Sequence, residues 1–155
     1  MSLITYSTEP WDEIKLEILP LWQSHWAEIS DPEDADYIPL DPDWDEYQAS
    51  ADCGILHITA ARSSGALVGY AFVFVKRGLH YKSTLLAHFD LYWVEPAMRG
   101  PWVGVRLFQE VERAMRARGV MKMTNRCKTW CDVSPIFARL GWKQDEAGFS
   151  KFIGD

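Results

Sequence analysis

Polar side chains recur at every second position in the apolar run AHFDLYWV, residues 87–94. His88, Asp90 and Tyr92 share one face of a strand unless a bulge interrupts it, because side chains alternate between faces in an extended chain. An imidazole, or a carboxylate acting through one water, can take a proton from an attacking nucleophile. The pattern predicts a general base on this strand. Each residue taken alone also fits a half-buried sheet position with a backbone partner.

A tight turn with the sequence RGPWVG, residues 99–104, follows this strand. Apolar residues at helical spacing from Gly104 to Met115 predict a helix after the turn, with Gly119 just beyond its end. The first N–H groups of a helix lack partners inside it, so this arrangement predicts an anion pocket. Pro101 offers no N–H. Trp102 should keep a negative φ, because left-handed geometry would cost it roughly 1–2 kcal/mol.

The cysteines predict less chemistry. Cys127 and Cys131 have a C-x-x-x-C spacing without a second ligand pair, so no metal site is predicted. Cys131 also lacks a local histidine to activate it, which favours a structural thiol. Together with Cys53 they make an odd number, and no secretory leader is visible, so we expect reduced thiols in a cytoplasm.

Charge is distributed unevenly along the 155 residues. Residues 1–54 hold 14 of the 22 acids and one of the 16 bases, a net charge of −13, whereas residues 55–155 carry +7. The asymmetry predicts two partners of opposite sign, although a solvated acidic surface explains it equally well. Overall acidity argues against nucleic acid as a partner. The length predicts one domain, and no apolar run approaches the roughly 20 residues of a membrane span.

Hydrophobic spacing predicts an alternation of strands and helices. Strands are expected at 3–6, 55–62, 66–77, 85–94, 120–125 and 149–153, and helices at about 10–29, 42–50, 104–118 and 135–141. Ser63-Ser64-Gly65 indicates a hairpin, and residues 30–41 and 76–84 are expected to be loops. The order predicts an α/β (α+β) fold, a mixed sheet with helices packed on it.

The ends of the helices are predicted from capping residues. Ser7 or Thr8 should cap the first helix, and Asp41 and Ser134 should cap the second and the last. Pro20 lies inside the first helix, where its ring would clash with the preceding turn. We therefore expect a kink there, or two abutting helices.

This order of elements, with two motifs, resembles the GNAT superfamily of acyl-CoA N-acyltransferases. The family pattern V-x-P-x-x-R-G-x-G-x-G stands here as VEPAMRGPWVG, residues 94–104, and a second pattern stands as PIFARLGW, residues 135–142. Residues 80–100 also resemble small GNAT proteins encoded by phages and prophages. The resemblance covers nearly the whole chain. It implies one GNAT N-acetyltransferase-like domain, with a mostly antiparallel sheet, a splay between strands four and five, and helices on both faces.

The resemblance implies that acetyl-CoA is the acyl donor. Its pantetheine arm would pair with the strand near Trp93 and Val94, and its pyrophosphate would sit on the turn amides. Trp102 replaces the family's middle glycine, so its indole should either cover the adenine or ribose or pack on the surface. The implied cofactor-binding residues are Trp93, Val94, Arg99, Gly100, Trp102, Val103, Gly104, Asn125, Ser134 and Phe137.

The implied reaction is direct attack of a primary amine on the thioester within a ternary complex. A strand amide near Val94 would polarise the thioester carbonyl. Phe137 stands where many members place a tyrosine that protonates the leaving thiolate. A thiol with a pKa of about 8.5 is a tolerable leaving group without that acid, and Tyr92 or Tyr81 offers a substitute. The alternative is a GNAT-shaped protein that binds CoA or a partner without catalysis.

The acceptor side is predicted to be acidic. His80 and Tyr81 are further candidates for lining it, and Asp34, Asp36, Asp41 and Asp43 would present a negative rim. Such a rim suits a polyamine, an amino sugar or a peptide lysine. The same acids would also serve solubility alone. The resemblance is compatible with a homodimer.

Overall fold

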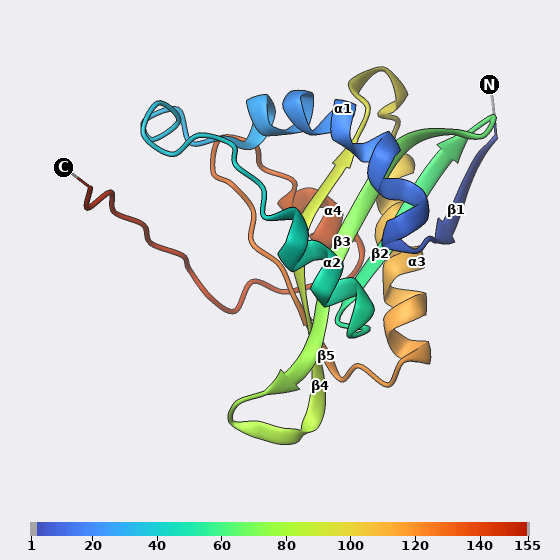
Figure 1. Cartoon of the computed structure of the whole chain (residues 1–155). Helices are drawn as coiled ribbons and strands as arrows, with labels where there is room; N and C mark the ends of the chain where they lie inside the picture. The colour runs from blue at the N-terminus through green and yellow to red at the C-terminus, as the bar shows by residue number, and fades with distance from the viewer. Residues whose placement is uncertain (1–2, 155) are drawn as a thin grey trace.

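Five strands form one sheet in the order β1-β2-β3-β4-β5 in the computed structural model, which describes residues 3–154 (Figure 1). The strands are β1 (Ile4–Thr8), β2 (Leu56–Ser63), β3 (Ala66–Gly78), β4 (Tyr81–Val94) and β5 (Lys122–Thr124). Neighbouring strands are antiparallel except for β4 and β5, which are parallel. The predicted mixed, mostly antiparallel fold is confirmed.

Helices cover both faces of this sheet (Figure 1). They are α1 (Trp11–Ile29), α2 (Trp44–Asp52), α3 (Val103–Ala117) and α4 (Ser134–Arg139), with a 3₁₀ turn, η1 (Pro96–Met98), before α3. Gly119 follows α3 with φ +75°, as expected of a residue that ends a helix. None of the described helices is long and apolar enough to cross a membrane.

Two hydrophobic clusters hold the helices to the sheet. On one face, Ile14 and Ile18 of α1 are fully buried against Tyr70 and Phe72 of β3. On the other face, α3 contributes Leu107, Val111 and Met115, which pack against the alanines and valines of β2, β3 and β4. The helical spacing of these apolar residues explains why each helix buries one side only.

A bulge in β4 changes which residues share a face. Leu91 pairs with Phe72 and Phe89 with Val73, so Asp90 is the additional residue. Asp90 and Leu91 consequently face the α1–α2 side together, while Tyr92 faces α3. The prediction that His88, Asp90 and Tyr92 share one face is wrong for Tyr92, because the bulge shifts the alternation by one residue.

The pairing of β4 with β5 is short. It runs from Leu86 opposite Lys122 to His88 opposite Thr124 and then stops. From Phe89 to Val94, β4 pairs only with β3, so the two strands diverge. The predicted splay between the fourth and fifth strands lies at this point.

Two predictions about chain ends and loops are wrong. Residues 76–84 are not a loop, because β3 continues to Gly78 and β4 begins at Tyr81. Residues 149–153 do not form a closing strand, since 143–154 have no regular structure and Phe149 is 97% exposed. The three residues of β5 offer such a strand little edge to pair with.

The helix boundaries also differ from the predictions. Pro20 does not divide α1 into two helices, because it lies on the exposed side of one continuous helix, where water can replace its missing hydrogen bond, and the kink stays a prediction. Thr8 belongs to β1 and Ser7 caps nothing, since Pro10 stands at the N-cap of α1.

The caps of α2 and α4 are displaced by two residues and one residue, respectively. Asp43, rather than Asp41, accepts the Glu46 amide hydrogen bond at 2.9 Å and caps α2. Ser134 is the first residue of α4, and its amide donates to Asp132 Oδ1 at 2.8 Å.

Candidate functional site

The turn that is predicted to bind an anion lies where the chain leaves β4, passes η1 and enters α3. Trp102 is the N-cap of α3 with φ −121°, which confirms the expected negative φ. The first amide that bonds to the N-cap residue is that of Arg106, which donates to Trp102 O at 2.8 Å. The amides of Gly104 and Val105 come before it and have no acceptor inside the helix. No described side chain caps this end. These backbone donors and the helix dipole can receive an anion.

Gly104 has a packing role that the motif did not reveal. A Cβ atom there would lie 3.1 Å from Ile136 Cδ1, so the glycine lets α4 approach the start of α3. At Gly100, by contrast, a Cβ atom would find its nearest neighbour, Val103 Cγ2, at 3.8 Å. Gly100 therefore leaves free space beside the turn.

Trp102 packs beneath a cation from α4. The Arg139 guanidinium carbon lies 5.2 Å from the centroid of the Trp102 ring, and Arg139 donates to Pro101 O at 3.1 Å. Trp102 is still 57% exposed. Of the two roles expected for this indole, the structure shows surface packing, with more than half of the residue free to meet a ligand.

Beyond the end of the β4–β5 pairing, polar side chains of β4 and of the segment after β5 contact each other. Asn125 Nδ2 donates to the Tyr92 hydroxyl at 3.1 Å, and Cys127 Sγ lies 3.9 Å from the same hydroxyl. Burial raises the pKa of Tyr92, so the phenol keeps its proton. Val94 ends β4 two residues after Tyr92, and Trp93 beside it is buried on the α1 side.

Phe137 packs into a cluster of aromatic rings, and its side chain has no proton to donate. Its ring lies 4.7 Å from that of Phe108 and 6.2 Å from that of Tyr92, and the residue is 7% exposed. Ser134, three residues earlier, is exposed. The structure thus places Asn125 and Phe137 beside Tyr92 and leaves Ser134 at the surface.

A pocket of about 320 Å³ opens on the α1–α2 side, next to the bulge. Asp90 lies in its wall, where the Tyr47 hydroxyl donates to Asp90 Oδ2 at 2.7 Å. Loss of water around the carboxylate raises the pKa of Asp90, and the hydrogen bond from Tyr47 offsets this only in part. A carboxylate with a raised pKa in a pocket is a candidate proton acceptor.

The pocket combines aromatic walls with acidic groups. Trp22, Trp26 and Tyr47 supply the rings, and Asp41 and Asp43 stand beside Asp90 among the lining residues. The Trp22 indole nitrogen has no hydrogen-bond partner within the described chain. This donor is almost fully covered by protein atoms, so it costs folding free energy without being open to the pocket.

His25 also lines this pocket and was not singled out as a site residue from the sequence. It is 3% exposed, and its Nδ1 lies 2.9 Å from the Tyr70 hydroxyl. Burial lowers the pKa of His25 to about 4, so it is neutral at physiological pH. The sequence indicated its burial only through its helical spacing with the apolar residues of α1.

The other predicted base lies apart from the pocket. His88 is on the same face as Asp90 but contacts Thr124 Oγ1 of β5, and it does not line the pocket. Burial, followed by Lys76 and Arg126, lowers the pKa of His88. Asp90 is therefore the better placed candidate.

Two predicted acceptor-side residues are remote. His80 and Tyr81 lie at the tip of the β3–β4 hairpin, and neither lines the pocket. Tyr81 is 13 residues before Val94 on one strand, and at about 3.3 Å per residue it stands roughly 40 Å from the turn. Tyr81 cannot replace the missing tyrosine at 137.

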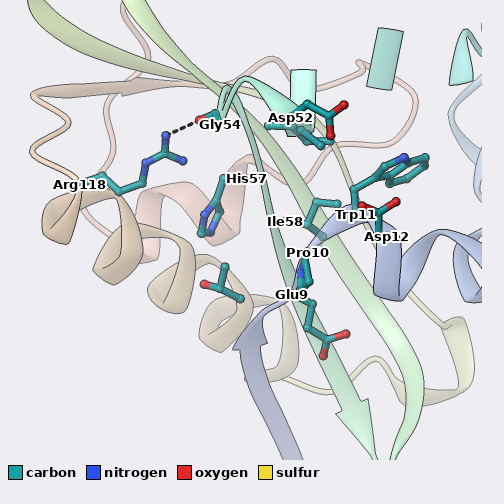
Figure 2. Close-up of a pocket in the computed structure, with 12 residues that line it drawn as sticks. Glu9, Pro10, Trp11, Asp12, Asp52, Gly54, His57, Ile58 and Arg118 are labelled. Carbon is teal, nitrogen blue, oxygen red and sulfur yellow. Dashed lines mark hydrogen bonds between the residues drawn. The ribbon is translucent and has the colours of Figure 1, made fainter. Parts of the chain in front are cut away.

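A second pocket, of about 510 Å³, lies between the start of α1, the end of α2 and the end of α3 (Figure 2). Its charged groups are paired within the protein. Arg118 donates to Gly54 O at 2.7 Å, and Gln48 donates to Asp52 at 3.0 Å. His57 is buried with Nε2 3.1 Å from Thr59 Oγ1. This larger pocket contains none of the residues predicted for catalysis.

The sequence matches the acetyltransferase (GNAT) family over residues 12–141, which includes both β4 and the turn before α3. The chain belongs to the GNAT acetyltransferase family. The resemblance seen in the two motifs is thereby confirmed at the level of the family. Among curated proteins, none matches the sequence significantly.

Solved structures with the same fold include several acetyltransferases. An aminoglycoside acetyltransferase from an uncultured soil metagenomic sample, bound to sisomicin, has a TM-score of 0.73 and 12% identity, covering 97% of both chains. The aminoglycoside N-acetyltransferase AAC(6')-Iy in complex with CoA has a TM-score of 0.72 and 16% identity, covering 99% of this chain and 96% of that one.

A ribosomal-protein-alanine N-acetyltransferase from Brucella melitensis biovar Abortus 2308 has a TM-score of 0.71 and 14% identity, covering 98% of this chain and all of that one. At these identities the likeness establishes the GNAT fold of this chain. The acceptor has to be argued from the pocket itself.

Proposed function

We propose that this GNAT protein transfers an acetyl group from acetyl-CoA to a primary amine by direct attack in a ternary complex. The observation that carries the proposal is the bulge at Asp90. It turns a carboxylate with a raised pKa into the pocket, beside the stretch of β4 that has no β5 partner. An amine in the pocket and a thioester on β4 would meet at this point.

The cofactor would use the backbone of two adjoining segments. The free edge of β4 near Trp93 and Val94 can pair with the pantetheine amides, and the amides that begin α3 can receive the pyrophosphate. Each contact of an anion with a helix N-terminus contributes about 0.3–1 kcal/mol when exposed. Trp102 and Arg139 stand at the outer side of this turn, where an adenine or a phosphate would lie.

Proton transfer would involve Asp90 first. The amine gives a proton to Asp90, directly or through one water, and its lone pair attacks the thioester carbonyl. The C–S bond then breaks, and the sulfur leaves as a thiolate that takes a proton. Tyr92, whose hydroxyl accepts a hydrogen bond from Asn125, would supply this proton to the sulfur, unless water does. Phe137 has no part in this step.

The pocket favours a cationic acceptor that also carries hydroxyl groups. Asp41 and Asp90 attract a cation. Asp43 is less available to it, because its Oδ1 already accepts a hydrogen bond from the Glu46 amide at the start of α2. A sugar ring can pack on the walls formed by Trp22 and Trp26, and its hydroxyl groups can donate to the carboxylates of Asp41 and Asp90. An amino sugar therefore fits these features better than a polyamine or a lysine side chain, neither of which carries hydroxyl groups.

The test is a thiol-release assay with acetyl-CoA and a panel of amino sugars, polyamines and lysine peptides, beside CoA binding measured by thermal shift. We expect CoA to stabilise the protein and amino sugars to give the highest kcat/KM. Stabilisation by CoA with no thiol release for any amine would instead support a GNAT protein that binds CoA without catalysis. No response to CoA would contradict the proposal altogether.

A further inference from the structure

Glu28, one residue before the end of α1, joins segments that are far apart in the chain. It accepts hydrogen bonds from both terminal nitrogens of Arg99, at 2.8 and 2.6 Å. Trp93 Nε1 donates to it at 3.2 Å, and Cys131 Sγ lies 3.7 Å from it. One carboxylate thus contacts the end of β4, the turn before α3 and the segment after β5.

Arg99 is held on two of its edges by protein groups. Its Nε donates to Val94 O at 2.9 Å, and its remaining nitrogens form the paired contact with Glu28. Such a bidentate pair fixes the guanidinium plane as well as its position. Arg99 therefore links the turn to the last residue of β4 and to α1, while its side chain stays 41% exposed.

We propose that Glu28 is a positioning residue for the cofactor. By holding Arg99, it fixes the turn of residues 99–104 beside the end of β4, beyond the point where β4 and β5 diverge. Through Trp93 and Cys131 it also contacts the end of β4 and the segment after β5. The inference rests on the proposed function, because it assumes that this turn receives the pyrophosphate of CoA.

The energetic reason is preorganisation. Backbone donors bind an anion best when they are fixed before the ligand arrives, since ordering them later subtracts from the binding free energy. Without the Glu28 carboxylate, Arg99 would regain its rotamer freedom and the turn would lose its link to α1. The loss should therefore appear in cofactor affinity and leave the chemical step intact.

Glu17 provides a matched control on the same helix. It makes the same kind of paired contact, with Arg62 at 2.7 and 2.9 Å, on the part of α1 that lies over β2. Arg62 also binds Glu9. Replacing Glu17 removes one glutamate–arginine pair and leaves the turn of residues 99–104 and the end of β4 unchanged.

The test compares Glu28→Gln and Glu17→Gln by calorimetric CoA binding and by steady-state kinetics. A lost charge-assisted pair should raise the Kd for CoA and the KM for acetyl-CoA in Glu28→Gln about tenfold. Its kcat should change by less than about twofold, because Glu28 does not touch the reacting atoms. Glu17→Gln should bind CoA like the parent.

A second pair of variants separates positioning from a general loss of stability. Arg99→Ala should also weaken CoA binding, and adding Glu28→Gln to it should cost much less than Glu28→Gln costs alone, because the two variants remove the same Arg99–Glu28 contact. Additive losses in the double variant would contradict the inference.

The remaining outcomes are equally decisive. Equal or tighter CoA binding by folded Glu28→Gln, or by Arg99→Ala if Glu28→Gln does not fold, would overturn the positioning role while leaving the proposed function in place. A parent protein that binds no CoA would overturn the proposed function and this inference with it.

Discussion

The two pockets of this protein differ in how their polar groups are satisfied. The larger one, of about 510 Å³, is lined by Glu9, Asp12 and Arg118, and each of these has a partner within the chain. The smaller one, of about 320 Å³, contains an unpaired indole N–H and a carboxylate with a raised pKa. We therefore place the proposed acceptor site in the smaller pocket because of the raised pKa of its carboxylate, and not because of its volume.

The difference follows from the strands beside each pocket. At the larger pocket, β2 has strand neighbours on both sides, β1 and β3. At the smaller pocket, β4 bulges at Asp90 and loses its β5 neighbour after His88. A strand edge without a β5 partner and a carboxylate that lines the pocket occur together there, and the proposed reaction needs both.

The largest effect should come from exchanging a carboxylate for an amide in each pocket. Asp90→Asn removes the proposed base, and general-base catalysis is worth about 10²–10⁴-fold. We expect kcat to fall at least about 100-fold in Asp90→Asn and to be unchanged in Asp52→Asn, an exposed residue of the larger pocket. Equal losses in both variants, measured by thiol release, would remove the distinction between the pockets.

The next effect concerns the cofactor turn. Gly100→Glu adds a negative charge beside the amides that begin α3, where a side chain has space. CoA affinity should fall about tenfold or more, with little change in Tm. Gly148→Glu, in the C-terminal segment with nothing within 4 Å, is the control. Gly104 is unsuitable for this test because its variant would press on Ile136. Unchanged affinity in Gly100→Glu would place the pyrophosphate elsewhere.

In contrast to activity, acid stability should depend on both pockets alike. Burial lowers the pKa of His25 and of His57 to about 4. The unfolded chain binds the proton near pH 6.5 and the folded chain only near pH 4, so stability is lost as pH falls through this window. Each histidine should contribute about 1.4 kcal/mol per pH unit to that slope.

Urea unfolding between pH 7 and 4.5 measures this loss. Replacing either histidine with glutamine should flatten the slope by a similar amount, because burial is its main cause at both positions. The charge of Arg99 also lowers the pKa of His25, and the charge of Glu28 raises it. At His57, Arg118 lowers the pKa and Glu110 raises it. A flattening confined to His25 would show that the larger pocket admits water.

The smallest effect should be a difference in salt dependence. Asp41 lines the smaller pocket, and no hydrogen bond or ion pair within residues 3–154 engages its carboxylate. With a screening length of about 10 Å at 0.1 M salt, kcat/KM for a dicationic acceptor should fall more with salt than for a monoamine. Asp41→Asn should reduce this difference, whereas Asp36→Asn, outside the pocket lining, should not. Equal salt slopes in the parent would leave the acids as solubilising groups.

Much of the fold followed from local patterns. Helical spacing located α1 and α3, and the hairpin at Ser64-Gly65 forms with positive φ at both residues. The family pattern located the turn before α3. The sequence order of strands and helices was sufficient for the fold because strands and helices each pack an apolar face into the core.

The details of the site did not follow, because they depend on contacts between distant segments. The bulge at Asp90 is set by pairing with β3, and the contact of Glu28 with Arg99 spans 71 residues. Neither leaves a local signal in the sequence. The single domain, the likeness to phage-encoded members, the cytoplasmic location and the homodimer stay predictions.

The central claim is that the amine binds in the pocket beside the bulge, and the indole N–H of Trp22 is its most direct reporter. In a protein–NMR titration with CoA bound, a cationic amino sugar should shift the Trp22 Nε1–H resonance and saturate it near the KM of that acceptor. The Arg118 resonances, at the larger pocket, should stay in place. A shift confined to Arg118 and its neighbours, with Trp22 unmoved, would contradict the assignment of the acceptor site.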